Sequence, residues 1–194
     1  MEQEVNIERA LKIDGWMQWD ELGWLARQAV TRSRIAEIGS YKGRSTRALA
    51  DHTPGYVLAV DHWQGPREVE MRQGDRDRLY GDFTENLKDL IAAHRVQRLM
   101  VDHAQLSADQ LRKLLKKIKL EPQFDMIFID GDHQYASVKH DIELWRPLLA
   151  DGGLLCGHDS GFPGVAKAIT EFIPGHQLVA GTQIWYWIND YAVQ

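Results

Sequence analysis

The chain has 194 residues, of which 44% are hydrophobic and 26% charged, values typical of one globular domain. Its formal net charge of −5 argues against broad, non-specific contact with nucleic acid. The N-terminus lacks the basic and apolar regions of a signal peptide, and no apolar run approaches the roughly 18–20 residues that span a bilayer. Cys156 is the only cysteine, so no internal disulfide can form and a reducing cytoplasm is the expected compartment. Together with the length, charge and hydropathy, this predicts one domain over 1–194 that binds neither membrane nor nucleic acid.

The N-terminal segment, residues 1–30, is expected to be helical. Its stretch WMQWDELGWLARQAV contains the apolar residues Trp16, Trp19, Leu22, Trp24 and Leu25. We interpret them as a helix face that packs on a sheet or on a partner chain, which makes a homodimer an expectation. Core packing is the preferred interpretation of the tryptophans over a role at a cofactor.

Beyond this segment, short β-rich runs alternate with helical patterns. The expected strands are 34–40, 56–63, 97–103, 124–132 and 152–159, and the expected helices are 44–51, 83–93, 107–119, 136–149 and 164–172. Nearly continuous apolar strands separated by helices are typical of a parallel sheet covered on both faces, which predicts a doubly wound α/β fold. The closing runs QLVAGT and QIWYWI have almost nothing between them and predict an antiparallel hairpin.

Residues 64–82, QGPREVEMRQGDRDRLYGD, fit no regular element and directly follow the second strand. A long loop at the carboxyl end of a strand is usually functional or disordered, so we predict a substrate lid with disorder as the alternative. Capping-box spacing of Asp82 with Glu85, and of Ser107 with Gln110, marks two helix starts. The basic run LRKLLKKIKL is interpreted as a solvated helix face, with docking of an acidic partner as the alternative.

The stretch AEIGSYKGRST lies between the first strand and the next helix. Gly39 and Gly43 allow a tight turn and close approach of a ligand, and backbone N–H groups at the helix start would face that ligand. Asp61 closes the second strand, where a carboxylate can accept two hydrogen bonds from a ribose diol. These features predict a nucleoside site.

The glycine pattern narrows the choice of nucleoside. A dinucleotide fingerprint requires glycine where this chain has Tyr41 and Arg44, and the phosphate-loop pattern is also absent. Glu37 adds a second carboxylate that suits a positively charged ligand. S-adenosylmethionine, which carries a ribose, an ammonium and a sulfonium, fits this description. Asp102, at the end of the third strand, is interpreted either as a contact on the adenine side or as a surface acid.

A second polar group follows strands four and five. Asp130 ends strand four, and His158 and Asp159 end strand five, so neighbouring parallel strands should bring the three together. Two carboxylates and an imidazole suit a divalent ion, which would make a bound hydroxyl more acidic. His133, shortly after Asp130, suits the role of base. We interpret Asp132 as a cap of the following helix or as a solvated group. We interpret His140 and Asp141 as surface residues of that helix.

At EIGSYKGRST, VDHW, FIDGDHQYASVKHDIELWRPLLADGGLLCGHD and FPGV, the chain resembles class I S-adenosylmethionine-dependent methyltransferases. The similarity is to the small-molecule O-methyltransferase branch with cephalosporin hydroxylase-like and macrocin O-methyltransferase-like proteins. It implies a Rossmann-like seven-stranded sheet, order 3-2-1-4-5-7-6, with strand 7 antiparallel and helices on both faces. It also implies a base at the position of His133 and often a metal after strands four and five. Relatives usually carry Asp or Glu where this chain has His158; imidazole favours Zn, Mn or Fe over Mg, or indicates a base or substrate contact without metal.

We therefore predict S-adenosylmethionine-dependent O-methylation of a small hydroxylated acceptor, such as a sugar or natural product. The alternatives are a nicotinamide-dependent oxidoreductase and a non-catalytic nucleoside-binding protein. The expected catalytic residues are His133 and Asp130, and the expected ligands for Mg, Mn or Zn are Asp130, His158 and Asp159. The expected cofactor-binding residues are Glu37, Gly39, Ser40, Tyr41, Gly43, Ser45, Asp61, His62, Asp102, His103 and Asp130.

Overall fold

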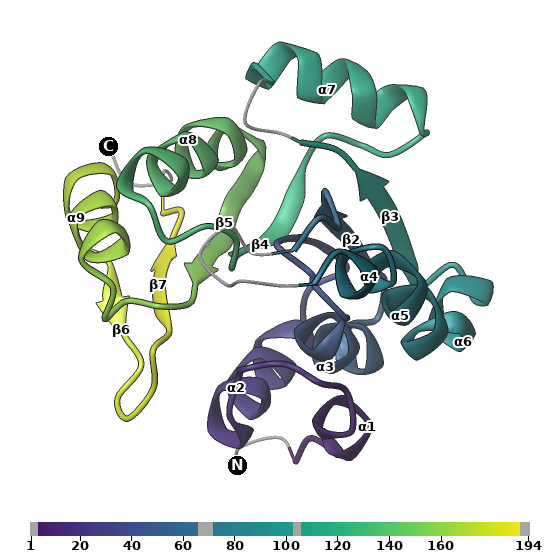
Figure 1. The fold of residues 1–194 in the computed structure, drawn as a ribbon. Coiled ribbons are helices and arrows are strands. Elements are labelled where there is room, and N and C mark those ends of the chain that lie inside the picture. Colours follow the sequence, from purple (N-terminus) through teal and green to yellow (C-terminus); the bar gives the residue numbers. More distant parts are fainter. Residues whose placement is uncertain (1–3, 66–71, 103–105, 191–194) are drawn as a thin grey trace. The chain divides into compact units, whose positions relative to one another are not determined.

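The computed structural model describes residues 4–65, 72–102 and 106–190 (Figure 1). It divides into two compact units, Met1–Val101 and Asp102–Gln194, each of which is described by itself. The strand order is β3-β2-β1-β4-β5-β7-β6, and β7 is antiparallel to β5. This order confirms the predicted Rossmann-like α/β topology, while the expectation of one domain over 1–194 stays a prediction.

The first unit contains three parallel strands and the helices that flank them in the chain. Its elements are α1 (Glu8–Leu11), α2 (Trp19–Ala29), β1 (Arg34–Ile38), α3 (Arg44–His52), β2 (Tyr56–Asp61), α4 (Gln73–Arg76), α5 (Leu79–Asn86), α6 (Lys88–Ala92) and β3 (Val96–Met100). Strand β1 pairs in register with β2, and β2 with β3. The interior residues of β1 and β2 are buried, as expected for strands covered on both faces. Helices α1 and α2 both pack against α3 (Figure 1).

Two of the five apolar residues that were expected to pack in the N-terminal segment are not in the core. Leu22 and Leu25 are fully buried on α2, but Trp16 is 60% exposed and Trp19 is 69% exposed. The interpretation of these two tryptophans as core residues is therefore wrong. Helix α2 buries its leucines and alanines on one side, and Trp19, at its first position, extends away from them. The alternative of packing on a partner chain stays a prediction.

The predicted irregular stretch 64–82 contains helical structure. Helix α4 and the first residues of α5 lie inside it, so the expectation of no regular element is wrong for these residues. Leu79 and Phe83, one helical turn apart, are both buried, and this burial stabilises a helix that the glycines obscured. Because α5 begins at Leu79, Asp82 does not cap it, and that capping-box prediction is wrong too. Residues 66–71 lie outside the described residues, and the lid stays a prediction.

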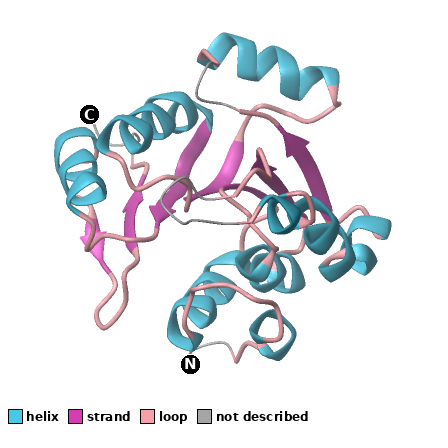
Figure 2. Ribbon diagram, in the orientation of Figure 1, coloured by secondary structure: helices cyan, strands magenta, loops and turns pink. Residues whose placement is uncertain are grey.

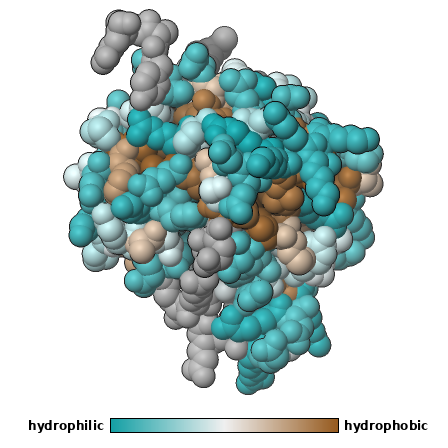
Figure 3. Space-filling model, turned by 90° about the horizontal axis from the view of Figure 1, so that it is seen from above, coloured by the Kyte–Doolittle hydropathy of each residue, from teal (hydrophilic) through white to brown (hydrophobic). Residues whose placement is uncertain are grey.

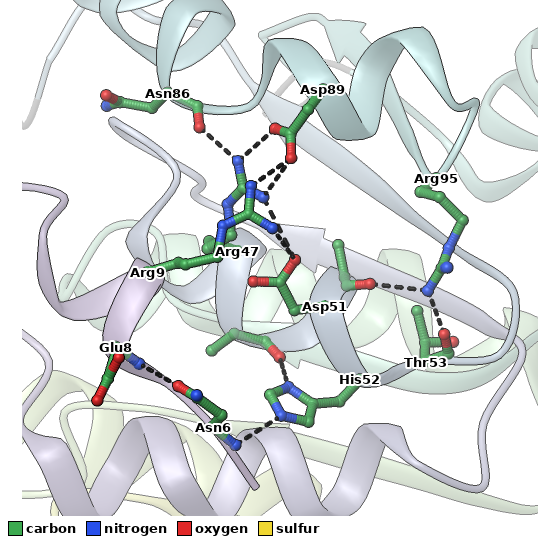
Figure 4. A network of polar contacts seen from close by, with 12 residues as sticks. Asn6, Glu8, Arg9, Arg47, Asp51, His52, Thr53, Asn86, Asp89 and Arg95 are labelled. Atoms are coloured by element: carbon green, nitrogen blue, oxygen red, sulfur yellow. Dashed lines mark hydrogen bonds and ion pairs between the residues drawn. The ribbon is translucent and has the colours of Figure 1, made fainter.

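A network of charged side chains joins three helices of the first unit (Figure 4). Arg47 of α3 is 3% exposed and donates to both carboxylate oxygens of Asp89, at 2.6 and 3.0 Å. It also donates to the carbonyl of Asn86 at 2.7 Å and to Asp51 at 3.3 Å. Arg9 of α1 reaches the same two carboxylates. The hydrogen bond from Arg47 holds the pKa of Asp89 well below its usual range, against the opposing effect of burial.

The second unit contains the other four strands. Its elements are α7 (Ala108–Lys117), β4 (Phe124–Ile129), α8 (Tyr135–Trp145), a 3-10 turn η2 (Arg146–Leu148), β5 (Leu149–Gly157), α9 (Pro163–Phe172), β6 (Gln177–Leu178) and β7 (Trp185–Ile188). Strand β4 pairs parallel with β5, and β7 pairs antiparallel with both β5 and β6 (Figure 2). The predicted closing hairpin is therefore confirmed. Helices α8 and α9 pack against each other.

Helix α7 behaves as the sequence pattern predicts. Ser107 and Gln110 form the expected reciprocal capping box at its start. Leu111 and Leu115 are buried, while Lys113, Lys116 and Lys117 are exposed, so the basic run is a solvated helix face. The face of the protein in Figure 3 is hydrophilic over much of its area, with hydrophobic residues visible between polar ones. Within the described ranges, no helix combines the length and apolar character required to cross a membrane.

Candidate active site

The β1–α3 turn, residues 39–43, is built on left-handed backbone. Gly39 has φ 87°, Tyr41 has φ 46° and Gly43 has φ 91°. A Cβ on Gly43 would also lie 2.7 Å from a methyl carbon of Leu87, so both the conformation and the packing require glycine there. The turn reverses the chain between the end of β1 and the start of α3, as the glycine pattern predicts.

Asp61, at the end of β2, holds this turn in place. Its Oδ2 accepts hydrogen bonds from the backbone N–H groups of Ser40, at 2.9 Å, and Tyr41, at 2.8 Å. Its Oδ1 accepts from the backbone N–H of Trp63 at 2.6 Å. A carboxylate offers about four acceptor positions, and these N–H groups use three of them. Asp61 is therefore a structural clamp on the turn as well as the predicted ribose contact.

Glu37 supports the turn from within the core. Its side chain is fully buried, and its Oε2 accepts from the hydroxyl of Ser40 at 2.7 Å and from the hydroxyl of Thr46. Because an isolated buried charge is costly, these hydroxyl donors are what keep such a carboxylate tolerable in the core. The structure thus gives Glu37 a bond to the turn, and contact between Glu37 and a cofactor stays a prediction.

Trp63 is a member of this site to which the sequence analysis gave no role. Its backbone has φ 50°, its side chain is 5% exposed, and its indole N–H donates to the carbonyl oxygen of Tyr41 at 2.9 Å. The turn is thus held by Asp61 at two N–H groups and by Trp63 at a carbonyl. On its outer side, the Trp16 ring packs on the Tyr41 ring with centroids 4.8 Å apart. The motif VDHW was the available signal for Trp63.

The remaining predicted cofactor residues are distributed as follows. Ser45 is buried in the first turn of α3. His62 is part-exposed beside Asp61, with its Nδ1 3.7 Å from Asp61 Oδ1 and accepting from the backbone N–H of Gln64 at 2.9 Å. Asp102 is exposed beyond the end of β3, and His103 lies outside the described residues. Their roles toward a cofactor stay predictions.

In the second unit, the structure brings four predicted residues together in the β4–β5 cluster, consisting of Asp130, His133, His158 and Asp159. Asp159 is at its centre: its Oδ2 lies 2.7 Å from His133 Nε2, and its Oδ1 lies 3.2 Å from His158 Nδ1. His158 Nδ1 is also 3.6 Å from Asp130 Oδ1. The backbone N–H of His158 donates to the carbonyl of Ile129, which fixes the end of β5 beside the end of β4.

The electrostatics of the β4–β5 cluster favour an ionised Asp159. Burial alone would raise the pKa of Asp159, but hydrogen bonds from His133 and His158 hold that pKa well below its usual range. Its backbone is left-handed, with φ 61°, a conformation that Asp tolerates better than most residues. One carboxylate thus contacts an imidazole through each oxygen.

The β4–β5 cluster lines a small cavity of about 10 Å³, close to the space that one water molecule needs. Trp185 of β7 also lines this cavity and is 1% exposed. A Cβ on Gly157 would lie 2.5 Å from the Trp185 ring, so glycine at the end of β5 permits this close packing. The indole therefore forms a rigid apolar wall for the cavity.

Two neighbouring acids have structural roles. Asp132 accepts from the backbone N–H of Gln134 at 3.0 Å and from the hydroxyl of Ser137 at 2.8 Å, so it holds the segment that leads into α8. The N-cap residue of α8 is Gln134, which makes no side-chain cap hydrogen bond, so the interpretation of Asp132 as the cap of this helix is wrong. Asp141 is 3% exposed, so its interpretation as a surface residue is wrong. Asp141 lies on the same side of α8 as the buried Val138 and Trp145, a position that the spacing alone did not reveal.

The donor set of the β4–β5 cluster fits a divalent metal ion. Asp130, His158 and Asp159 each offer a ligand atom, and these atoms lie within 4.8 Å of one another. Two carboxylate oxygens and one imidazole nitrogen are ligands that Mn²⁺ and Zn²⁺ accept readily, whereas Mg²⁺ prefers oxygen alone. The geometry is therefore compatible with the predicted metal site.

Comparison with known proteins identifies a family and several structures that this chain is similar to. Residues 36–160 match the family described as a methyltransferase domain. Protein y4gI of Sinorhizobium fredii (strain NBRC 101917 / NGR234) is 27% identical over 150 residues, which are 75% of this chain and 15% of that protein, so the chain spans a small part of that relative.

Two solved structures illustrate the shared fold. The calicheamicin methyltransferase CalS11 superposes with a TM-score of 0.63 at 16% identity, covering 86% of this chain and 76% of that one. A putative caffeoyl-CoA O-methyltransferase from Staphylococcus aureus superposes with a TM-score of 0.64 at 15% identity, covering 96% and 93%. The family match extends over both the β1–α3 turn and the β4–β5 cluster. The chain therefore belongs to the family described as a methyltransferase domain, whose match covers residues 36–160.

Proposed function

We propose that this chain transfers a methyl group from S-adenosylmethionine to a hydroxyl oxygen of a small acceptor, and that His133 takes the proton of that hydroxyl. The observation that carries the proposal is the 2.7 Å contact of His133 Nε2 with Asp159 Oδ2, at a cavity that both residues line. An imidazole that is held by an ionised carboxylate is well suited to general base catalysis near neutral pH.

The proposed methyl transfer needs no reactant beyond the acceptor and S-adenosylmethionine. The acceptor oxygen attacks the methyl carbon, so that a C–O bond forms while the C–S bond breaks and its electrons return to sulfur. The sulfonium becomes a neutral thioether, and the hydroxyl proton passes to His133. With Nε2–H donated to Asp159, the proton is taken at Nδ1, and Asp159 stabilises the imidazolium that results.

The proposed donor site is the β1–α3 turn with Asp61. Asp61 uses three of about four acceptor positions for backbone N–H groups, which leaves capacity for a ribose hydroxyl. The clamp also orders the turn before a ligand arrives, and an ordered site loses less entropy on binding. The nicotinamide alternative has no support from the family match, and the glycine pattern disfavours it.

Asp130, His158 and Asp159 are the residues that would hold a divalent ion. When bound there, such an ion would supply positive charge that lowers the pKa of a coordinated hydroxyl. The two oxygens of Asp159 have separate neighbours, because Oδ1 is near His158 and Oδ2 is near His133. The carboxylate can therefore hold the base and contribute to an ion site at once.

The proposed acceptor class is a small hydroxylated molecule, of which a sugar or a natural product is an example. CalS11, which shares the fold, is described as a TDP-rhamnose 3'-O-methyltransferase. The proposal for this chain is limited to a small hydroxylated molecule, because the likeness to CalS11 at 17% identity concerns the fold.

The proposal is tested in two stages. Titration calorimetry with S-adenosylmethionine is expected to show binding, and repetition with Mg²⁺, Mn²⁺, Zn²⁺ and a chelator reveals whether an ion binds. Release of S-adenosylhomocysteine is then measured across a panel of sugars, sugar nucleotides and phenols. Cofactor binding with no turnover of any acceptor, with or without metal, would favour the non-catalytic alternative.

A further inference from the structure

The segment 159–164, which comprises the β5–α9 turn and the first two residues of α9, contacts His133 at three separate points. Asp159 holds the ring nitrogen Nε2 at 2.7 Å. The Phe162 ring stacks on the imidazole, with centroids 4.4 Å apart and an angle of 25° between the planes. Gly164 lies against the backbone: a Cβ there would be 2.3 Å from the His133 carbonyl oxygen and 2.7 Å from the N atom of Tyr135. Nitrogen, ring face and backbone of His133 are thus all contacted by one short segment.

This segment is itself held in one conformation. The backbone N–H of Phe162 donates to the carbonyl of Asp159 at 2.9 Å, which closes the turn. Ser160 donates to the carbonyl of Gln183 at 3.0 Å, and Gly161 donates to the side-chain oxygen of Gln183 at 2.9 Å. Pro163 then starts α9 with a fixed φ. The turn can therefore serve as a rigid support.

Phe162 has an unusual environment for a residue whose role is only to stabilise the fold. Its side chain is 46% exposed, so it contributes little to the core, yet its ring covers one face of an imidazole. The carboxylate of Asp159 restrains only one end of the His133 ring. A phenyl ring stacked on the imidazole opposes rotation of the imidazole out of its plane and adds to the restraint that the hydrogen bond at Nε2 gives.

We propose that Phe162 and Gly164 are positioning residues that fix the orientation of the His133 imidazole. Gly164 sets the position of the backbone, Phe162 sets the plane of the ring, and Asp159 sets its rotation in that plane. The effect on catalysis rests on the proposed function, because orientation matters only if His133 takes the acceptor's proton. A misplacement of about 1 Å at a reacting group can cost about 100-fold in rate.

The kinetic test compares Phe162→Ala with Phe162→Tyr, which keeps the stacking ring. We expect Phe162→Ala to lower kcat about 10- to 100-fold while the Kd for S-adenosylmethionine stays unchanged. Phe162→Tyr should restore kcat to within about twofold of the original chain, as a stacking role requires. Leu178→Ala is the matched control, because Leu178 is also an exposed apolar residue of the second unit, at 60% exposure. Equal kcat in Phe162→Ala and the control would overturn the proposal.

An independent readout does not depend on turnover. The imidazole C–H resonances of His133, assigned by their loss in His133→Gln, should carry a ring-current shift from Phe162. Phe162→Ala should remove this shift and Phe162→Tyr should keep it; resonances that do not move in Phe162→Ala would refute the stacking contact. If the original chain shows no methyl transfer while these shifts behave as expected, the proposed function has failed and the positioning contact stands.

Gly164→Ala adds a second perturbation, because its new methyl group would collide with the His133 carbonyl. In a folded variant, the same His133 resonances should shift and kcat should fall. Unchanged resonances with unchanged kcat would show that Gly164 has no positioning role. If this variant does not fold, the Phe162 pair decides.

Discussion

The β1–α3 turn and the β4–β5 cluster both use carboxylates at strand ends, but these carboxylates have different partners. Asp61 and Glu37 accept hydrogen bonds from backbone N–H groups and hydroxyls. Asp159 contacts two imidazoles. Amide and hydroxyl donors keep their protons near neutral pH, whereas an imidazole exchanges its proton there. The first region is therefore suited to holding a ligand, and the second to moving a proton.

The strongest test of this contrast is His133→Ala in the second region. If His133 is the base, kcat should fall about 10²- to 10⁴-fold, while calorimetry should find the affinity for S-adenosylmethionine unchanged. His176→Ala is a suitable control, because His176 lies in the same unit but is not part of the β4–β5 cluster, and its Nδ1 contacts the Ile173 carbonyl at 3.0 Å. A fully active His133→Ala would remove the proton-transfer role from this region.

The reciprocal test is Asp61→Asn in the first region. Asparagine keeps only one acceptor oxygen, so its NH₂ group must face either the N–H groups of Ser40 and Tyr41 or the N–H of Trp63, and the clamp on the turn should weaken. We expect the Kd for S-adenosylmethionine to rise about 10- to 100-fold, with kcat at saturating cofactor nearly unchanged. An affinity equal to that of the original chain would show that the turn does not bind the donor.

A third experiment measures how much the buried Arg47 contributes to the stability of the first unit. Arg47→Ala removes a guanidinium that is 3% exposed and leaves Asp89 and the Asn86 carbonyl without it. We expect the free energy of unfolding to fall by about 2–4 kcal/mol, less than for a fully buried pair because the Asp89 side chain is 47% exposed. Denaturant titration measures this loss. Lys88→Ala, which removes an exposed ion pair, should show no measurable change.

The smallest expected effect is on the pH dependence of stability. The pKa of Asp89 is lowered mainly by its hydrogen bond with Arg47, so the folded chain binds this proton more weakly than the unfolded chain does. Its contribution to stability is thus fully present above the unfolded value of about 3.9 and is lost as the pH falls through the folded pKa. Unfolding curves between pH 6 and pH 3 should show a shallower loss of stability in Arg47→Met. Identical slopes would contradict this origin.

Much of the fold was predictable, because its signals are local and repeated. Apolar strands separated by helices indicated the parallel sheet, and the parallel direction of β4 and β5 explains why Asp130 and Asp159, far apart in the chain, lie close together. The predicted strands were too long at their ends, because polar site residues such as Asp130 leave the sheet there. Cys156, the cysteine from which no internal disulfide can form, is buried on β5.

The incorrect predictions concern features that depend on neighbours in space. Trp16 and Trp19 have apolar side chains, but a sequence does not show whether another element covers them. Asp141 has a charge that suggests the surface, yet it lies on the buried side of α8. The helices within 64–82 were hidden by Gly74 and Gly81, which a helix tolerates at a cost of about 1 kcal/mol each. The stacking of Phe162 on His133 had no periodic signal at all.

The left-handed backbone of Asp159 has a practical consequence for experiments on this protein. Asparagine adopts that conformation nearly as readily and occupies the same volume, whereas alanine or valine would strain the main chain at the end of β5. An amide at this position would remove the negative charge between the two histidines and replace one of the two acceptor oxygens by an NH₂ donor, without straining the main chain. Asp159→Asn therefore separates an electrostatic contribution from a folding defect, which truncation of the same side chain would confuse.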